Sequence, residues 1–176
     1  MKSLVLASLL LFGDSTCLVG FPNSMPQQLR DARPDLTVSG SCALGRPAGE
    51  YAQWTAPDDL RALLAADPGA DCLLLIGVND WRFTGDPKEA ATNVFDLADI
   101  CSSEYGRQAF GSTTWPTTTY PGRQEWTEDL NNWLVWMGAL LDVPVIDTRP
   151  VNSGVVWGQC TNTTCTTGGD QIHPWC

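Results

Sequence analysis

The sequence predicts an α/β protein with a mostly parallel sheet, and two observations support this fold class. Short apolar runs of strand length alternate along the chain with segments of helical periodicity. Several of the apolar runs end directly in glycine or polar residues, as strands do at the edge of a sheet. Strands that alternate with helices are joined by right-handed crossovers, which place helices over both faces of the sheet. At 176 residues the chain has the length of one domain with a substantial core, so we expect a single domain over 1–176.

Apolar runs predict the positions of the strands, which we expect at 4–12, 36–39, 71–76, 143–146 and, more weakly, 109–115. The first run follows Lys2, so it also has the pattern of a signal peptide. However, no small-residue cleavage site precedes Gly13, and the run is too short to span a bilayer. We therefore interpret it as a buried first strand, with any export signal lying outside this chain.

Four segments have the features of helices. A short helix is expected at 26–32, and a second at 57–66 has an acidic first turn and a Pro-Gly stop. A third begins at Asp86-Pro87 and runs as far as Leu97 or Ile100, with proline in its first turn. The clearest apolar stripe predicts a helix over 126–141, in which residues recur at intervals of three and four: Trp126, Leu130, Trp133, Leu134, Met137, Leu140 and Leu141.

Composition and charge exclude several classes of partner. Hydrophobic residues make up 43% and charged residues 17% of the chain, which is ordinary for a globular protein. The net charge of −10, without a basic cluster, would repel phosphate backbones and anionic lipid headgroups. We therefore expect no nucleic-acid partner and no membrane insertion. We also expect a monomer.

Seven cysteines are many for a reduced compartment, and several lie in polar segments. They favour disulfides and an extracellular or secreted protein, with Cys160 and Cys165 as one plausible pair. Because the number is odd, at least one thiol should stay free, and Cys72 in its apolar run is the best candidate. Zinc is disfavoured because Cys160-x4-Cys165 lacks the usual ligand spacing and the chain has one histidine. We expect no metal.

Gly13-Asp14-Ser15 ends the first apolar run and would place a hydroxyl at the end of a strand, where α/β proteins keep functional groups. A serine nucleophile needs a base, and His173 is the single imidazole. Asp170 precedes it by three residues, close enough in a tight turn to fix its tautomer. Ser15 could instead be a helix N-cap, and His173 an ordinary loop residue.

An oxyanion hole for acyl transfer also has candidates at strand ends. Gly40 and Asn79 each follow an expected strand, and with the backbone N–H of Ser15 they would supply three donors. Asn79-Asp80 could alternatively be turn residues.

These blocks together resemble the SGNH (GDSL) hydrolases: Gly13-Asp14-Ser15, Gly40, Gly77-x-Asn79-Asp80 and Asp170-x-x-His173-Pro174 occur in the order of that family. The resemblance implies a flavodoxin-like, three-layer α/β/α fold with Ser15, Asp170 and His173 as catalytic triad, and Ser15, Gly40 and Asn79 as oxyanion hole. It departs from the family at the end, because the chain stops three residues after His173, where a helix usually follows. The Gly-x-Ser-x-Gly elbow of ordinary α/β-hydrolases is absent, since Cys17 stands at its second glycine.

In that fold Cys17 and Cys42 would lie on neighbouring segments, and we expect them to form a disulfide beside the oxyanion hole. Trp81 could line a substrate pocket, as could Trp115 and Trp157, although a packing role is the more ordinary interpretation. Trp126, Trp133 and Met137 are expected in the core.

The expected function is a serine esterase that hydrolyses a carboxylic ester through an acyl-serine intermediate, without a cofactor. Gly-Asp-Ser-Thr resembles the opening block of the carbohydrate acetylesterases in this family, which favours a short acyl group such as acetyl on a carbohydrate. A catalytically silent, glycan-binding relative and an acyltransferase are the alternatives.

Overall fold

A computed structural model describes residues 8–18, 25–114 and 122–149 of the chain. Several of the residues considered above lie outside the described residues: Trp115, Trp157, Cys160, Cys165, Asp170, His173 and Cys176. The start of the first apolar run, residues 4–7, also lies outside them.

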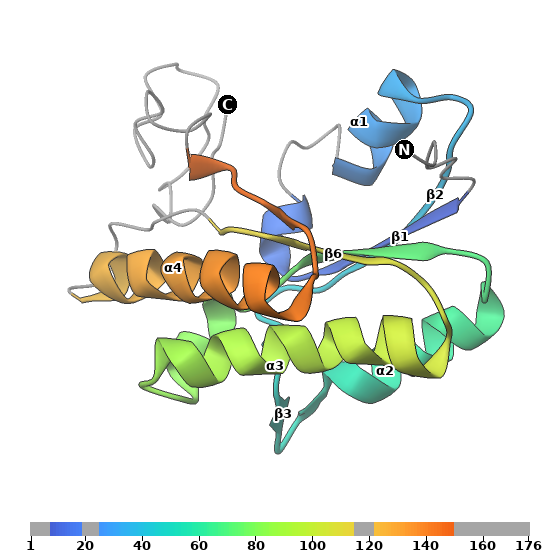
Figure 1. The fold of residues 1–176 in the computed structure, drawn as a ribbon. Coiled ribbons are helices and arrows are strands. Elements are labelled where there is room, and N and C mark those ends of the chain that lie inside the picture. Colours follow the sequence, from blue (N-terminus) through green and yellow to red (C-terminus); the bar gives the residue numbers. More distant parts are fainter. Residues whose placement is uncertain (1–7, 19–24, 115–121, 150–176) are drawn as a thin grey trace, which may run out of the picture.

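The fold is α/β, as the alternation of elements predicted (Figure 1). Among the residues described, the main sheet has five parallel strands in the order β2-β1-β5-β6-β7. Their bounds are β1 Ser8–Gly13, β2 Thr37–Cys42, β5 Asp71–Leu75, β6 Ala109–Ser112 and β7 Val145–Ile146. The weakly predicted strand near 109 is therefore real. The first strand lies between β2 and β5, so the segments that follow these three strands meet at one edge.

Four α-helices in the described ranges cover the sheet, and each was expected within a few residues of its position. They are α1 Met25–Ala32, α2 Ala56–Ala66, α3 Pro87–Asp99 and α4 Arg123–Leu141. Figure 1 shows α2, α3 and α4 on one side of the sheet and α1 on the other. No helix in the described part of the chain is both long enough and apolar enough to cross a membrane.

Short elements complete the described fold, and the sequence patterns missed them. A two-stranded hairpin joins β3 Glu50–Tyr51 to β4 Trp54–Thr55. Two short 3-10 helices lie beyond strand ends. The first, η1 Ser15–Leu18, follows β1, and the second, η2 Val78–Arg82, comes soon after β5. A π-helical turn, Ile100–Glu104, extends α3.

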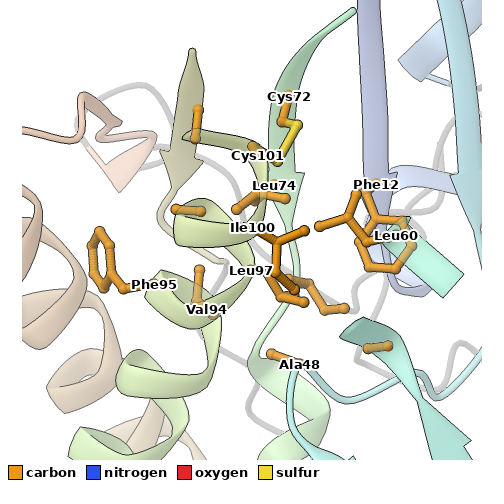
Figure 2. Packing of buried hydrophobic residues seen from close by; sticks show 14 of the residues in the cluster. Phe12, Ala48, Leu60, Cys72, Leu74, Val94, Phe95, Leu97, Ile100 and Cys101 are labelled. Atoms are coloured by element: carbon orange, nitrogen blue, oxygen red, sulfur yellow. A yellow bond between two sulfur atoms is a disulfide. The ribbon is translucent and has the colours of Figure 1, made fainter. Parts of the chain in front are cut away.

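The core divides into two clusters because successive residues of a strand face opposite sides of the sheet. Leu10 and Phe12 face the larger cluster under α2, α3 and α4, which Figure 2 shows around Leu74, Val94 and Leu97. Leu9 and Leu11 face the smaller cluster, which partly buried Leu29 of α1 covers. An interior strand of a parallel sheet is covered on both faces, so its successive residues are all buried. The apolar run before Gly13 has this burial pattern, as expected.

The sheet-facing stripe of α4 ends one turn earlier than expected. Leu130 and Leu134 are fully buried, and Trp126 is also in the core, with Trp133 and Met137 partly buried against it. In the last turn the residue against the sheet is Gly138, where a Cβ would lie 2.4 Å from Cγ2 of Val145. Leu140 and Leu141 are 66% and 51% exposed, so their expected place on the buried stripe is wrong.

Cys72 is not a free thiol, because it forms a disulfide with Cys101. The two Cα atoms lie 6.6 Å apart, and both side chains are fully buried between β5 and the end of α3 (Figure 2). The prediction from the sequence was wrong because it depended on the apolar character of residues 72–76 alone. The π-helical turn that brings Cys101 under β5 has no recognisable signal in the sequence.

Candidate active site

Ser15 lies where β1 ends, at the carboxyl edge of the sheet. Gly13 is the last residue of the strand, and a Cβ there would lie 2.6 Å from the carbonyl oxygen of Leu75 and 2.8 Å from Sγ of Cys17. Only glycine fits this position without a shift of the neighbouring backbone. The N–H of Asp14 then donates to the Leu75 carbonyl at 3.1 Å, and Ser15 begins η1 with 6% of its surface exposed. The crowding around Gly13 thus fixes where the serine leaves the strand.

Three segments from separate strands are joined at this edge by hydrogen bonds. The carbonyl of Gly13 accepts from the N–H of Ala43 and from the Arg46 guanidinium, both at 3.2 Å. The Nδ2 of Asn79 donates to the carbonyl of Arg46 at 3.4 Å. The structure therefore brings the segment of Ser15 and that of Asn79 together, through a turn that lies between them.

Gly40 lies elsewhere than expected, because β2 does not end there. The strand runs to Cys42, and the register pairs Gly40 with Leu11 and Cys42 with Gly13. Gly40 is thus two residues, or about 7 Å, short of the sheet edge. A glycine ends many strands, but here it permits close packing instead, since a Cβ would lie 2.9 Å from Cγ of Pro26.

The glycine that does follow β2 is Gly45, in a turn over residues 43–46. The N–H of Arg46 donates to the carbonyl of Ala43 at 3.3 Å, and Gly45 has a φ of +74°. A positive φ at the third position is what a type II turn requires, and glycine adopts it without strain. The sequence analysis singled out Gly40 and not Gly45, because no local pattern showed which of the two glycines follows the strand.

Asp80, next to Asn79, is a fully buried carboxylate with four donors around it. Its Oδ2 accepts from the N–H of Ala48 at 2.6 Å, and its Oδ1 accepts from the N–H of Gly49, the hydroxyl of Tyr51 and Nδ2 of Asn93 at 3.1, 3.3 and 3.0 Å. Burial raises the pKa of Asp80, and these hydrogen bonds oppose the shift. The carboxylate ties the segment after the 43–46 turn to η2 and α3.

Trp81 is partly buried and packs against the larger core cluster. The guanidinium of Arg123, a fully buried residue at the start of α4, lies 5.3 Å from the centre of its ring. One face of the indole is therefore occupied from within the protein, which favours the packing interpretation for that face. A role of Trp81 in binding substrate stays a prediction.

The disulfide between Cys17 and Cys42 is confirmed. It joins η1, which carries Ser15 at its start, to the last residue of β2, so it crosses the edge where the site residues lie.

Cys17 and Cys42 are 25 residues apart, so their bond closes a loop that restricts the unfolded chain. Replacing both by alanine removes this restriction and should lower the free energy of unfolding by about 3 kcal/mol. Urea denaturation of the full chain under non-reducing conditions measures the change. The matched control is the Cys72→Ala, Cys101→Ala pair, whose separation of 29 residues is similar but which lies inside the core. Unchanged stability in the first variant would show that the Cys17–Cys42 bond contributes nothing in solution.

The arrangement defines a class of protein, a parallel α/β fold with helices on both faces. In this class a serine follows one strand, here β1, and an asparagine amide follows its neighbour, here β5. Within this class, the chain has the fold of the SGNH hydrolases, as its similarity to a set of solved structures shows.

Carbohydrate acetylesterase Est24 from Sinorhizobium meliloti superposes with a TM-score of 0.68 at 16% identity, over 80% of this chain and 83% of that one. Esterase EstA from a Pseudoalteromonas species gives 0.70 at 16% identity, over 96% and 88%. A member of the lipolytic G-D-S-L family from Veillonella parvula gives 0.72 at 15% identity, over 95% and 88%. No protein-family model matches the sequence, and no curated protein matches it.

Proposed function

We propose that the protein is a serine ester hydrolase with Ser15 as its nucleophile. The observation that carries the proposal is the position of Ser15: it leaves the strand at the carboxyl edge, next to the segment that holds the Asn79 amide. In parallel α/β proteins this edge is where sites form. Structures of the same fold include proteins described as a carbohydrate acetylesterase and an esterase, which supports ester hydrolysis as the chemistry.

His173 is proposed as the base, and Asp170 as the carboxylate that orients it. His173 is the one histidine of the chain, and the spacing Asp170-x-x-His173 suits a tight turn. The imidazole would take the Ser15 proton as Oγ attacks the ester carbonyl, and would return it to the leaving alcohol. Water would then hydrolyse the acyl-serine with the same base.

The oxyanion would be held by the backbone N–H of Ser15 and the side-chain amide of Asn79. An amide nitrogen carries two N–H groups, and the carbonyl of Arg46 accepts one of them. The other donates to none of the described residues, so it would be the donor to the substrate. Each such donor contributes about 10²- to 10³-fold to kcat in serine hydrolases.

For the third donor we propose the backbone N–H of Gly45 in place of Gly40. Gly40 lies inside the strand, whereas the 43–46 turn lies beyond its end. Within this turn Ala43 and Arg46 use their N–H groups in hydrogen bonds, while those of Leu44 and Gly45 make none to another described residue. Gly45 also has no side chain to block the approach of a substrate.

The substrate class we propose is a short acyl ester, with acetyl on a carbohydrate as the first candidate. Support comes from the Gly-Asp-Ser-Thr block at the nucleophile and from the structural similarity to a carbohydrate acetylesterase. An extracellular or secreted location fits two disulfides, Cys17–Cys42 and Cys72–Cys101.

An active-site-directed fluorophosphonate tests the proposed nucleophile. Mass spectrometry of the digested, labelled protein should find the reagent on Ser15 and on no other serine. Chromogenic acetate, butyrate and octanoate esters should be hydrolysed with kcat/KM falling as the acyl chain lengthens. A label elsewhere would contradict the nucleophile, and a preference for octanoate would contradict the short acyl group. Transfer of the acyl group to an added alcohol, in place of water, would identify an acyltransferase.

A further inference from the structure

Arg46 is a buried cation directly under the end of β1, and no sequence motif pointed to it. The residue is 7% exposed, and its guanidinium lies 4.5 Å from the centre of the Phe12 ring. Nη1 donates to the carbonyl of Gly13 at 3.2 Å and to that of Ser41 at 2.9 Å. Nη2 donates to Oγ of Ser41 at 3.2 Å. A planar guanidinium can serve several acceptors at once, so this one side chain ties the 43–46 turn to β1 and β2.

The charge of Arg46 has counterparts on two sides. Nη2 also lies 3.4 Å from Oδ2 of Asp59 on α2, which is itself 44% exposed. Burial lowers the pKa of the Arg46 guanidinium, and the carboxylates of Asp59 and Asp14 oppose that shift. Arginine remains protonated throughout the ordinary pH range, so the guanidinium is a permanent positive charge beside the buried Asp14. The guanidinium is held by partners on β1, β2 and α2.

The backbone of the same residue holds Asn79. The carbonyl of Arg46 accepts the Nδ2 hydrogen bond at 3.4 Å, and Asn79 is 4% exposed. The side chain of Arg46 thus anchors its own turn to the Gly13 carbonyl, while its carbonyl sets the orientation of the Asn79 amide. Arg46 alone therefore connects the end of β1 to the Asn79 amide.

We propose that Arg46 is a positioning residue of this site: its guanidinium fixes the 43–46 turn on the strand that carries Ser15, and the turn aims the Asn79 amide at the reacting carbonyl. This inference rests on the proposed function, since it assigns a role within that site. If Arg46 acts in this way, it lowers the free energy of the transition state and does not change the affinity for substrate.

Steady-state hydrolysis of a chromogenic acetate ester by Arg46→Met, Asn79→Ala and the double variant tests the proposal. Arg46→Met should lower kcat about 10- to 100-fold with KM within twofold, because a small misplacement of a catalytic group can cost about 100-fold. In the Asn79→Ala background the same change should lower kcat by less than about threefold, since residues that act as a unit are not additive. A substitution that merely destabilised the protein would not show this loss of effect.

Two further variants separate positioning from general damage. Arg61→Met is the matched control, because it removes an arginine paired with Glu104 at 2.7 Å, away from the Ser15 edge, and should leave kcat within twofold. Arg46→Lys keeps the charge but cannot donate to the same acceptors, so its kcat should lie between that of the wild type and that expected for Arg46→Met. This variant tests the proposal even if Arg46→Met does not fold.

The outcomes distinguish the two proposals. A wild-type kcat for Arg46→Lys and Arg46→Met, or losses that multiply in the double variant, would overturn the role of Arg46 while activity still depended on Ser15. Hydrolysis that survives Ser15→Ala would instead overturn the proposed function itself, and the role of Arg46 with it.

Discussion

Replacing Ser15 by alanine is expected to lower kcat for a chromogenic acetate ester by at least about 10⁴-fold, because removal of a serine nucleophile eliminates the covalent pathway. The proposed mechanism has no second group that could form the acyl intermediate. The loss should appear in kcat and in kcat/KM alike, since the hydroxyl contributes to the transition state and little to substrate binding. Initial rates over a range of substrate concentrations measure both parameters.

The control for this variant is available on the same strand. Ser8 begins β1 and donates to Oδ2 of Asp67 at 2.9 Å, at the opposite end of the strand from Ser15. Ser8→Ala removes an equivalent hydroxyl and should keep the wild-type rate. Ser15→Ala removes one small group, and its thermal unfolding should match that of the wild type. Equal hydrolysis by Ser15→Ala and the wild type would refute Ser15 as the nucleophile. If neither protein hydrolysed the ester above the uncatalysed rate, the result would favour a protein that only binds its ligand.

Much of the fold could be predicted because its elements have periodic signals. The apolar run before Gly13 and the run at 71–76 are strands buried on both faces. Such a strand is a continuous apolar run in the sequence, so it can be predicted without knowing which strands pair with it. The helix over 126–141 was visible from its spacing, and α4 ends at Leu141 as expected. The exposure of its last turn could not be predicted, since whether Leu140 is buried depends on the approach of β7 at Gly138.

The candidate site was predictable only where residues are adjacent in sequence to a strand end. Ser15 and Asn79 follow their strands directly, or nearly so, and the structure brings their segments together. Gly40 was misplaced because a glycine that permits close packing within a strand looks the same in sequence as one that ends it.

The supporting contacts were missed for a different reason. Arg46 is 33 residues from Gly13, and Asp80 is 32 residues from Ala48, so neither contact follows from any local spacing. Both are buried charged groups, which the sequence alone would have placed on the surface. Their burial is explained only by the partners that the fold supplies.

Asp80 is the position where a single substitution should cost the most stability. Its carboxylate accepts two backbone N–H groups, from Ala48 and Gly49, together with donors from Tyr51 and Asn93. Asp80→Ala would leave these buried donors without an acceptor, and we expect the free energy of unfolding to fall by roughly 3–5 kcal/mol. Urea denaturation at pH 7, followed by tryptophan fluorescence and circular dichroism, measures the change.

Asparagine at position 80 separates the effect of hydrogen bonding from that of volume. Every partner of the carboxylate is a donor, and an amide of the same size offers one acceptor oxygen and directs an NH₂ group at the rest. Asp80→Asn should therefore be nearly as destabilising as Asp80→Ala, although it leaves no cavity. Asp96→Asn, on the exposed side of α3, is the matched control and should change stability by less than about 0.5 kcal/mol. Wild-type stability in Asp80→Asn would mean that the shape of the side chain, and not its negative charge, holds the segment between the 43–46 turn and β3 in place. In that case the two backbone donors would have found another acceptor, and the link from η2 to this segment would be one of packing.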